Sequence, residues 1–78
     1  MTKDQEKIKE KHLKASSEFE TEKSNGHSQK LVQVKNSWRR TFYDMLDGAR
    51  GESLPGETRI DFVARVYGID ADYLRQNL

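Results

Sequence analysis

The chain contains no cysteine and only one proline among its 78 residues. The absence of cysteine excludes a disulfide framework, a thiolate metal site and a cysteine nucleophile. Long apolar runs are also missing, since no stretch reaches the roughly 18 apolar residues that a transmembrane helix needs. The N-terminal region lacks the apolar core of a secretory signal peptide. We therefore expect a cytoplasmic protein that neither spans nor anchors in a membrane.

The sequence offers little for catalysis. Its two histidines, His12 and His27, lie in a polar N-terminal segment without a serine or carboxylate that a fold would hold beside them, so we expect both on the surface. The glycines are too dispersed for a phosphate-binding loop. Asp61, Asp70 and Asp72 lack the glycine and the spacing of a calcium loop. A chain of this size also has only a small core, and we predict no enzyme activity, cofactor or metal site.

Charge is unevenly distributed along the chain, although the net charge is only +1. Residues 1–22 are close to balanced, residues 23–43 contain basic side chains and no acid, and acids outnumber arginines from Asp44 onward. Apolar residues are sparse at the N-terminal end, which is typical of a solvated segment. We predict a flexible charged leader over residues 1–29, with a transient or partner-induced helix over Lys3–Glu22.

The strongest helical pattern covers residues 30–49. Apolar residues recur there at intervals of three or four positions, which predicts one apolar helix face. This face contains Leu31, Val34, Trp38, Phe42, Met45, Leu46 and Ala49. Lys35, Arg39 and Tyr43 follow one another at four-residue spacing along its flank, and Arg40 lies further round the helix.

A loop over residues 50–58 and two short helical patterns over residues 59–78 complete the chain. Thr58 is placed to cap the first short helix. Gly68 closes that helix, because glycine adopts the left-handed backbone conformation without steric cost. Asp70 then stands at the N-cap position of the last helix. The sequence thus predicts an all-α fold, a three-helix domain over residues 30–78 after the flexible leader.

The spacing of Ala64, Gly68, Ile69 and Leu74 resembles the helix-turn-helix of the lambda-repressor/Cro type of DNA-binding domain. The resemblance implies that the last helix enters the major groove of double-stranded DNA. The positions that it places toward the major groove are Asp70, Ala71, Asp72, Tyr73, Arg75 and Gln76, of which Ala71, Tyr73, Arg75 and Gln76 are the expected DNA contacts. Backbone contacts are expected from Lys35, Arg39, Arg40 and Arg65. Asp70 and Asp72 oppose this, since carboxylates repel phosphates, and Arg59 and Arg65 are placed to offset them.

We therefore expect a small DNA-binding transcriptional regulator. The alternative is a non-catalytic accessory protein that docks the apolar stripe around Trp38 on a larger partner. The small core, and a last helix with an under-covered inner face, favour a homodimer or a larger protein complex. Its interface candidates are Trp38, Phe42 and Tyr73. Binding that weakens steeply with salt is typical of the first function and not of the second.

Overall fold

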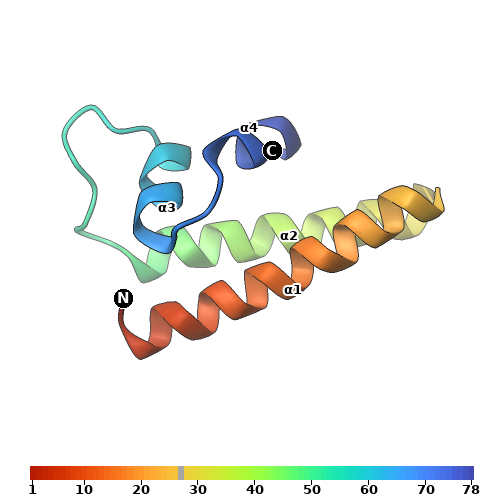
Figure 1. The fold of residues 1–78 in the computed structure, drawn as a ribbon, viewed down its shortest axis with the longest axis horizontal. Coiled ribbons are helices and arrows are strands. Elements are labelled where there is room, and N and C mark those ends of the chain that lie inside the picture. Colours follow the sequence, from red (N-terminus) through yellow and green to blue (C-terminus); the bar gives the residue numbers. More distant parts are fainter. Residues whose placement is uncertain (27) are drawn as a thin grey trace.

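The computed structural model describes residues 1–26 and 28–78. These residues form four helices, α1 (Lys3–Asn25), α2 (Ser28–Gly48), α3 (Arg59–Tyr67) and α4 (Ala71–Asn77). The described residues contain no strand, so the all-α prediction is confirmed. Helices α1 and α2 form an antiparallel hairpin, and α3 and α4 lie together along one side of it (Figure 1). None of the described helices is long and apolar enough to cross a membrane.

Helix α1 replaces the flexible leader that the sequence predicts for residues 1–29. Its positions toward α2 alternate at three- and four-residue spacing, as in a helical seam. They are Gln5, Ile8, His12, Ala15, Phe19 and Glu22. Half of these residues are polar. The amino-acid sequence of α1 therefore shows no continuous apolar stripe, although one side of this helix packs against α2. The surface position expected for His12 is wrong, since only 1% of this residue is exposed. The prediction for His27 lies outside the described residues.

Polar contacts set the register between α1 and α2. The Gln5 side-chain amide donates to the Gly48 carbonyl at 3.0 Å, and His12 Nδ1 lies 2.8 Å from the Thr41 hydroxyl. Between these two contacts each helix advances by one heptad, which is the repeat of coiled-coil packing. Because a buried polar group that loses its partner costs free energy, sliding one helix along the other is unfavourable.

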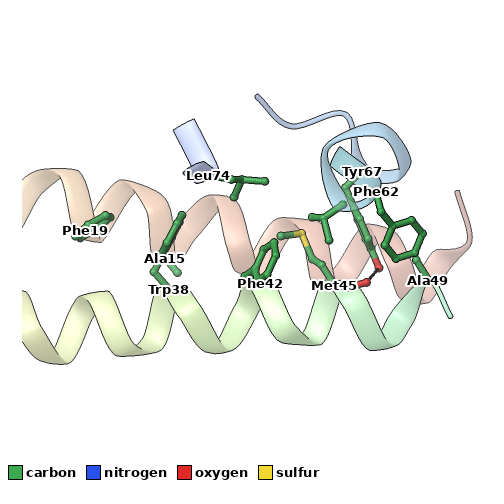
Figure 2. Packing of buried hydrophobic residues seen from close by; sticks show 10 residues of the cluster. Ala15, Phe19, Trp38, Phe42, Met45, Ala49, Phe62, Tyr67 and Leu74 are labelled. Atoms are coloured by element: carbon green, nitrogen blue, oxygen red, sulfur yellow. Dashed lines mark hydrogen bonds between the residues drawn. The ribbon is translucent and has the colours of Figure 1, made fainter. Parts of the chain in front are cut away.

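The C-terminal end of α2 is completed by side chains from other elements. The last carbonyls of a helix have no partner within it. The Tyr67 hydroxyl donates to the Met45 carbonyl at 2.8 Å, drawn as a dashed line in Figure 2. The Gln5 side-chain amide donates to the Gly48 carbonyl. Gln5 also donates to Glu52 Oε2 at 2.6 Å and accepts from the Thr2 backbone N–H at 3.0 Å, as part of the capping box of α1. One amide therefore joins α1, α2 and the following loop.

The core lies where α3 and α4 meet the hairpin. Figure 2 shows Tyr67 and Leu74 directed toward α2, on the side where Phe42 and Met45 project. The fully buried apolar side chains, with 0% exposure, are Trp38, Met45, Val63, Tyr67 and Leu74. Each large apolar side chain buried in this way stabilises the fold by about 1.5–3 kcal/mol. The apolar face predicted over residues 30–49 is confirmed by the burial of Trp38, Phe42, Met45 and Ala49.

The inner face of α4 is covered by α1 as well as by α2. The Tyr73 hydroxyl donates to Glu20 at 2.8 Å, and its ring packs edge-on against Trp38 at 5.9 Å between centroids. Lys23 donates to the Asn77 side chain, and Leu74 is fully buried. An under-covered last helix is one of the two grounds on which the sequence favours a homodimer or larger complex, and the structure removes this ground.

Replacement of Gly48 by alanine tests the close approach of three helices. A Cβ atom there would lie 2.8 Å from Ile8 Cδ1 and 2.8 Å from the Tyr67 hydroxyl oxygen. Ile8 can rotate, but the buried hydroxyl is held by the Met45 carbonyl. Overpacking costs about 1–3 kcal/mol, against about 1 kcal/mol gained in helix propensity. We expect Gly48→Ala to lower the free energy of unfolding by about 1 kcal/mol in urea titrations.

The background variant Tyr67→Phe provides the control for this substitution. It removes the oxygen atom that the new methyl group meets, so Gly48→Ala should cost less in this background than in the wild type. A Gly48→Ala protein as stable as the wild type would show that α1, α2 and α3 are not closely packed at this point.

Burial of His12 predicts a pH-dependent stability. The Thr41 hydroxyl donates to the Trp38 carbonyl at 2.6 Å, so His12 Nδ1 carries the proton in its contact with Thr41. His12 Nε2 is buried without a hydrogen-bond partner among the described residues. Burial lowers the pKa of His12 from 6.5 to about 4. Between these values the unfolded chain takes up a proton that the folded chain does not, so stability is lost as the pH falls, by up to about 3 kcal/mol.

The variant His12→Leu isolates this effect from the carboxylates, which also titrate at acidic pH. The difference in unfolding free energy between the wild type and His12→Leu, measured by urea titration at several pH values from 7 to 4.5, should change steadily in favour of the variant. A difference that stays constant over this range would mean that His12 is not buried in the neutral form.

Candidate nucleic-acid interface

Four cations on α2 and at the start of α3 have no acidic side chain as a partner. Lys35, Arg39, Arg40 and Arg59 have no Asp or Glu carboxylate oxygen within 4.0 Å among the described residues. We call these four residues the basic surface. The other cations from Lys30 to the C-terminal end are each paired with an acid: Lys30, Arg50, Arg65 and Arg75. Lys35 and Arg39 are half-buried, whereas Arg40 and Arg59 are exposed. Positive charge without neutralising partners attracts anions.

Arg39 and Arg59 come together across a groove between α2 and α3. The groove has a volume of about 560 Å³ and is lined by Arg39, Phe42, Tyr43, Thr58, Arg59, Ile60 and Leu78. The Thr58 side chain accepts a hydrogen bond from the Asp61 backbone N–H at 3.1 Å, so the N-cap predicted for this helix is confirmed. Because Thr58 begins α3 at this point, Arg59 is placed opposite the basic flank of α2.

The lysines of α1 form a different kind of surface. Lys7, Lys11 and Lys14 are exposed, and the acids Asp4 and Glu6 lie on the same helix at its N-terminal end. Lys7, Lys11 and Lys14 also have no Asp or Glu carboxylate oxygen within 4.0 Å among the described residues, but acids alternate with lysines along α1 and weaken the net field. The α1 lysines therefore provide a control of equal charge for tests of the basic surface.

The turn between α3 and α4 has the local structure that its residues predict. Gly68 adopts the left-handed conformation with φ of 68°, and its N–H donates to the Ala64 carbonyl. The Asp70 carboxylate accepts from the Asp72 backbone N–H at 3.0 Å as the N-cap of α4. Tight turns of this kind join helices in many all-α proteins. The likeness to the lambda-repressor/Cro motif therefore stays a prediction.

The residues predicted to read DNA from α4 differ in their availability. Arg75 is held by two carboxylates, Asp61 at 2.6 Å and Asp72 at 2.7 Å. Gln76 is exposed, and Ala71 is half-buried. Of the four predicted positions, Gln76 has a polar side chain that is exposed, and unlike Arg75 it is not held by neighbouring carboxylates.

Tyr73, the fourth of these positions, contributes mainly to packing. Its ring lies against Trp38, and burial together with the hydrogen bond to Glu20 raises the pKa of Tyr73 to about 12. The phenol therefore stays protonated at neutral pH and acts as a donor. This role ties α4 to α1, which differs from the predicted place of Tyr73 at DNA or at a partner.

Arg65 is engaged with the loop before α3. Its guanidinium donates twice to Glu57, at 2.9 and 3.1 Å, and once to the Glu52 carbonyl at 2.6 Å. The same contact lowers the pKa of the Glu57 carboxyl. With three acceptors already bound, Arg65 orders the loop, and it reaches a DNA phosphate only by leaving these contacts.

Trp38 and Phe42 belong to the core, in contrast to the partner interface that the sequence predicts for them. Trp38 is 0% exposed and Phe42 is 3% exposed. The indole N–H of Trp38 donates to the Ser16 hydroxyl at 2.8 Å, and the ring lies 5.4 Å from the Phe19 ring. Helix α1 covers the face of Trp38 that a partner was expected to occupy.

Comparison with known proteins finds no matching family model, no matching curated protein and no matching solved structure. The described residues also contain no group of three or more His, Asp or Glu side chains that could hold a metal ion. The function is therefore argued from the surface of this chain.

The variant Trp38→Ala tests whether Trp38 acts as a core residue. Truncation of a buried tryptophan costs about 3–5 kcal/mol, a large part of the stability of a small domain. We expect Trp38→Ala to lose most of its helical circular dichroism, or to unfold at much lower urea concentration. The exposed control Arg40→Gln should unfold as the wild type does. A Trp38→Ala protein of near-normal stability would restore Trp38 as a surface anchor.

Proposed function

We propose that this chain is a small, non-catalytic DNA-binding protein of the regulator type, which contacts the phosphates of double-stranded DNA through its basic surface. The proposal is supported by one observation: Lys35, Arg39, Arg40 and Arg59 have no Asp or Glu partners among the described residues, and two of them, Arg39 and Arg59, line one groove. Phosphate contacts supply most of the affinity of such proteins.

The C-terminal end of α4 borders the same surface. Arg39 Nη2 lies 3.4 Å from the Leu78 carbonyl, and Arg75 is joined to Asp61, two residues after Arg59. Gln76 on this end of α4 is exposed and can donate and accept hydrogen bonds with the edge of adenine. Arg75 reaches a base only by leaving Asp61 and Asp72. Phosphate binding by α2 and α3 is therefore the first step of the proposed mode, and base contacts from α4 are the second.

Docking of an apolar stripe on a larger protein is not proposed. The exposed large apolar side chains include Leu13, Val32, Tyr43 and Leu54. They belong to α1, α2 and the loop. Tyr43 packs against Phe42 of the core stripe, whereas Leu13 and Leu54 lie outside α2. Specific protein interfaces need a buried aromatic or aliphatic anchor. Trp38 cannot be this anchor while it packs against Ser16 and Phe19 of α1.

The salt dependence of DNA binding tests the proposed function. The wild type should bind mixed-sequence duplex DNA at low salt in a fluorescence anisotropy assay, and lose affinity steeply as salt rises. The triple variant Lys35→Gln/Arg39→Gln/Arg40→Gln should bind at least about tenfold more weakly at low salt. Its plot of log affinity against log salt should be shallower by about 0.9 for each phosphate that the variant no longer neutralises.

The matched control is Lys7→Gln/Lys11→Gln/Lys14→Gln, which removes the same charge from α1. Under the proposal it keeps nearly the wild-type affinity and slope. An equal loss of affinity in both triple variants would mean that only net charge matters. No binding by the wild type, even at low salt, would reject the proposed function.

A further inference from the structure

The groove between α2 and α3 has the composition of a site for a small organic anion. Two of its lining residues, Arg39 and Arg59, are cationic, and none of the seven has an acidic side chain. Its remaining walls are mostly apolar or aromatic: Phe42, Tyr43, Ile60 and Leu78. Sites for small molecules typically combine apolar walls with a few charged groups, in volumes of roughly 300–1,000 Å³, and this groove of about 560 Å³ falls within that range.

The two guanidinium groups are not neutralised by acidic side chains. Arg39 makes one long hydrogen bond, 3.4 Å, to the main-chain oxygen of Leu78, the last residue of the sequence, and this leaves most of its five N–H donors unused. Arg59 is exposed and has no Asp or Glu carboxylate within 4.0 Å among the described residues. Two positive charges that line one groove repel each other, and an anion between them relieves this repulsion. A phosphate or carboxylate can accept paired N–H donors from a guanidinium group.

Tyr43 supplies a surface against which a flat ring can stack. It is 54% exposed, although it is a large aromatic residue on a well-formed helix. Its ring packs edge-on against Phe42, with centroids 5.6 Å apart and an interplanar angle of 71°. Phe42 is a core residue with 3% exposure, so it is a fixed support for Tyr43. An aromatic side chain held in this way binds a second ring with little further loss of entropy.

We propose that this groove binds a small organic anion with a flat ring, its phosphate or carboxylate between Arg39 and Arg59 and its ring against Tyr43. This ligand site does not depend on DNA binding. Because Arg39 and Arg59 also belong to the basic surface, an occupant of the groove would compete with DNA phosphates for both residues. The chain would then release DNA when the ligand is present.

Phenyl phosphate is a suitable probe, with inorganic phosphate and phenol as its two separated parts. Titrations of the full chain, followed by amide chemical shifts in NMR spectra, give the affinity and the place of binding. We expect phenyl phosphate to bind at least about tenfold more tightly than inorganic phosphate, with the largest shifts around Tyr43 and Arg59. Tyr43→Ala should reduce this preference to about twofold.

Matched arginine variants separate a built site from general charge attraction. Arg39→Gln and Arg59→Gln should each weaken phenyl phosphate binding about tenfold. Arg40→Gln removes the same charge from a residue that does not line the groove, and should leave the affinity within twofold. Equal losses of affinity in all three variants, or phenyl phosphate no tighter than inorganic phosphate, would overturn the proposal.

The two proposals fail in different ways. Phenyl phosphate binding with these variant effects, together with no DNA binding at low salt, would retain the ligand site and reject the proposed function. Salt-dependent DNA binding without phenyl phosphate binding would retain the proposed function and reject the ligand site. When both bind, phenyl phosphate at a concentration that half-saturates the wild type should weaken DNA binding of the wild type, and should weaken that of Tyr43→Ala less.

Discussion

The side-chain amide of Gln5 is the contact on which the arrangement of helices most depends. It completes the capping box that begins α1, satisfies the Gly48 carbonyl at the end of α2, and binds Glu52 in the loop that leads to α3. A buried amide must keep all its hydrogen bonds, since breaking any of them leaves a polar group without water or partner. The start of α1 is thereby held at the end of α2, and the rest of the hairpin follows at heptad spacing.

A seam that mixes polar and apolar residues has a further effect on the fold. Apolar side chains alone would permit α1 to slide along α2 by one turn at modest cost, whereas the Gln5–Gly48 and His12–Thr41 contacts match in one register only. Polar groups in helical seams commonly specify register at some cost in stability. In His12 this cost is visible, because Nε2 is buried without a partner among the described residues.

The sequence predicted those parts of the fold that depend on local signals. The apolar face of α2, the Thr58 cap and the turn at Gly68 are each determined by residues within a few positions of one another, and the structure confirms them. Helix α1 could not be found in the same way, because Gln5, His12 and Glu22 are buried only through contacts with distant residues. That error also placed Trp38 at the surface, since α1 is what covers it.

The candidate site shows the same division. The row formed by Lys35, Arg39 and Tyr43 follows from helical spacing alone. The pairing of Arg75 with Asp61, and the position of Arg59 beside Arg39, depend on how α3 packs against α2 and α4. The sequence analysis named Arg59 only as a counter-charge to the carboxylates of α4, because nothing in its neighbourhood indicates the groove.

The position of Trp38 makes this chain its own spectroscopic reporter. It is the single tryptophan of the sequence. Its indole ring touches α1 through Ser16 and Phe19 and α4 through Tyr73, while it belongs to α2. The tryptophan fluorescence of the protein therefore arises from one point where three helices meet. A separation of α1 or α4 from α2 would expose this indole to water and shift its emission to longer wavelength, without any attached label.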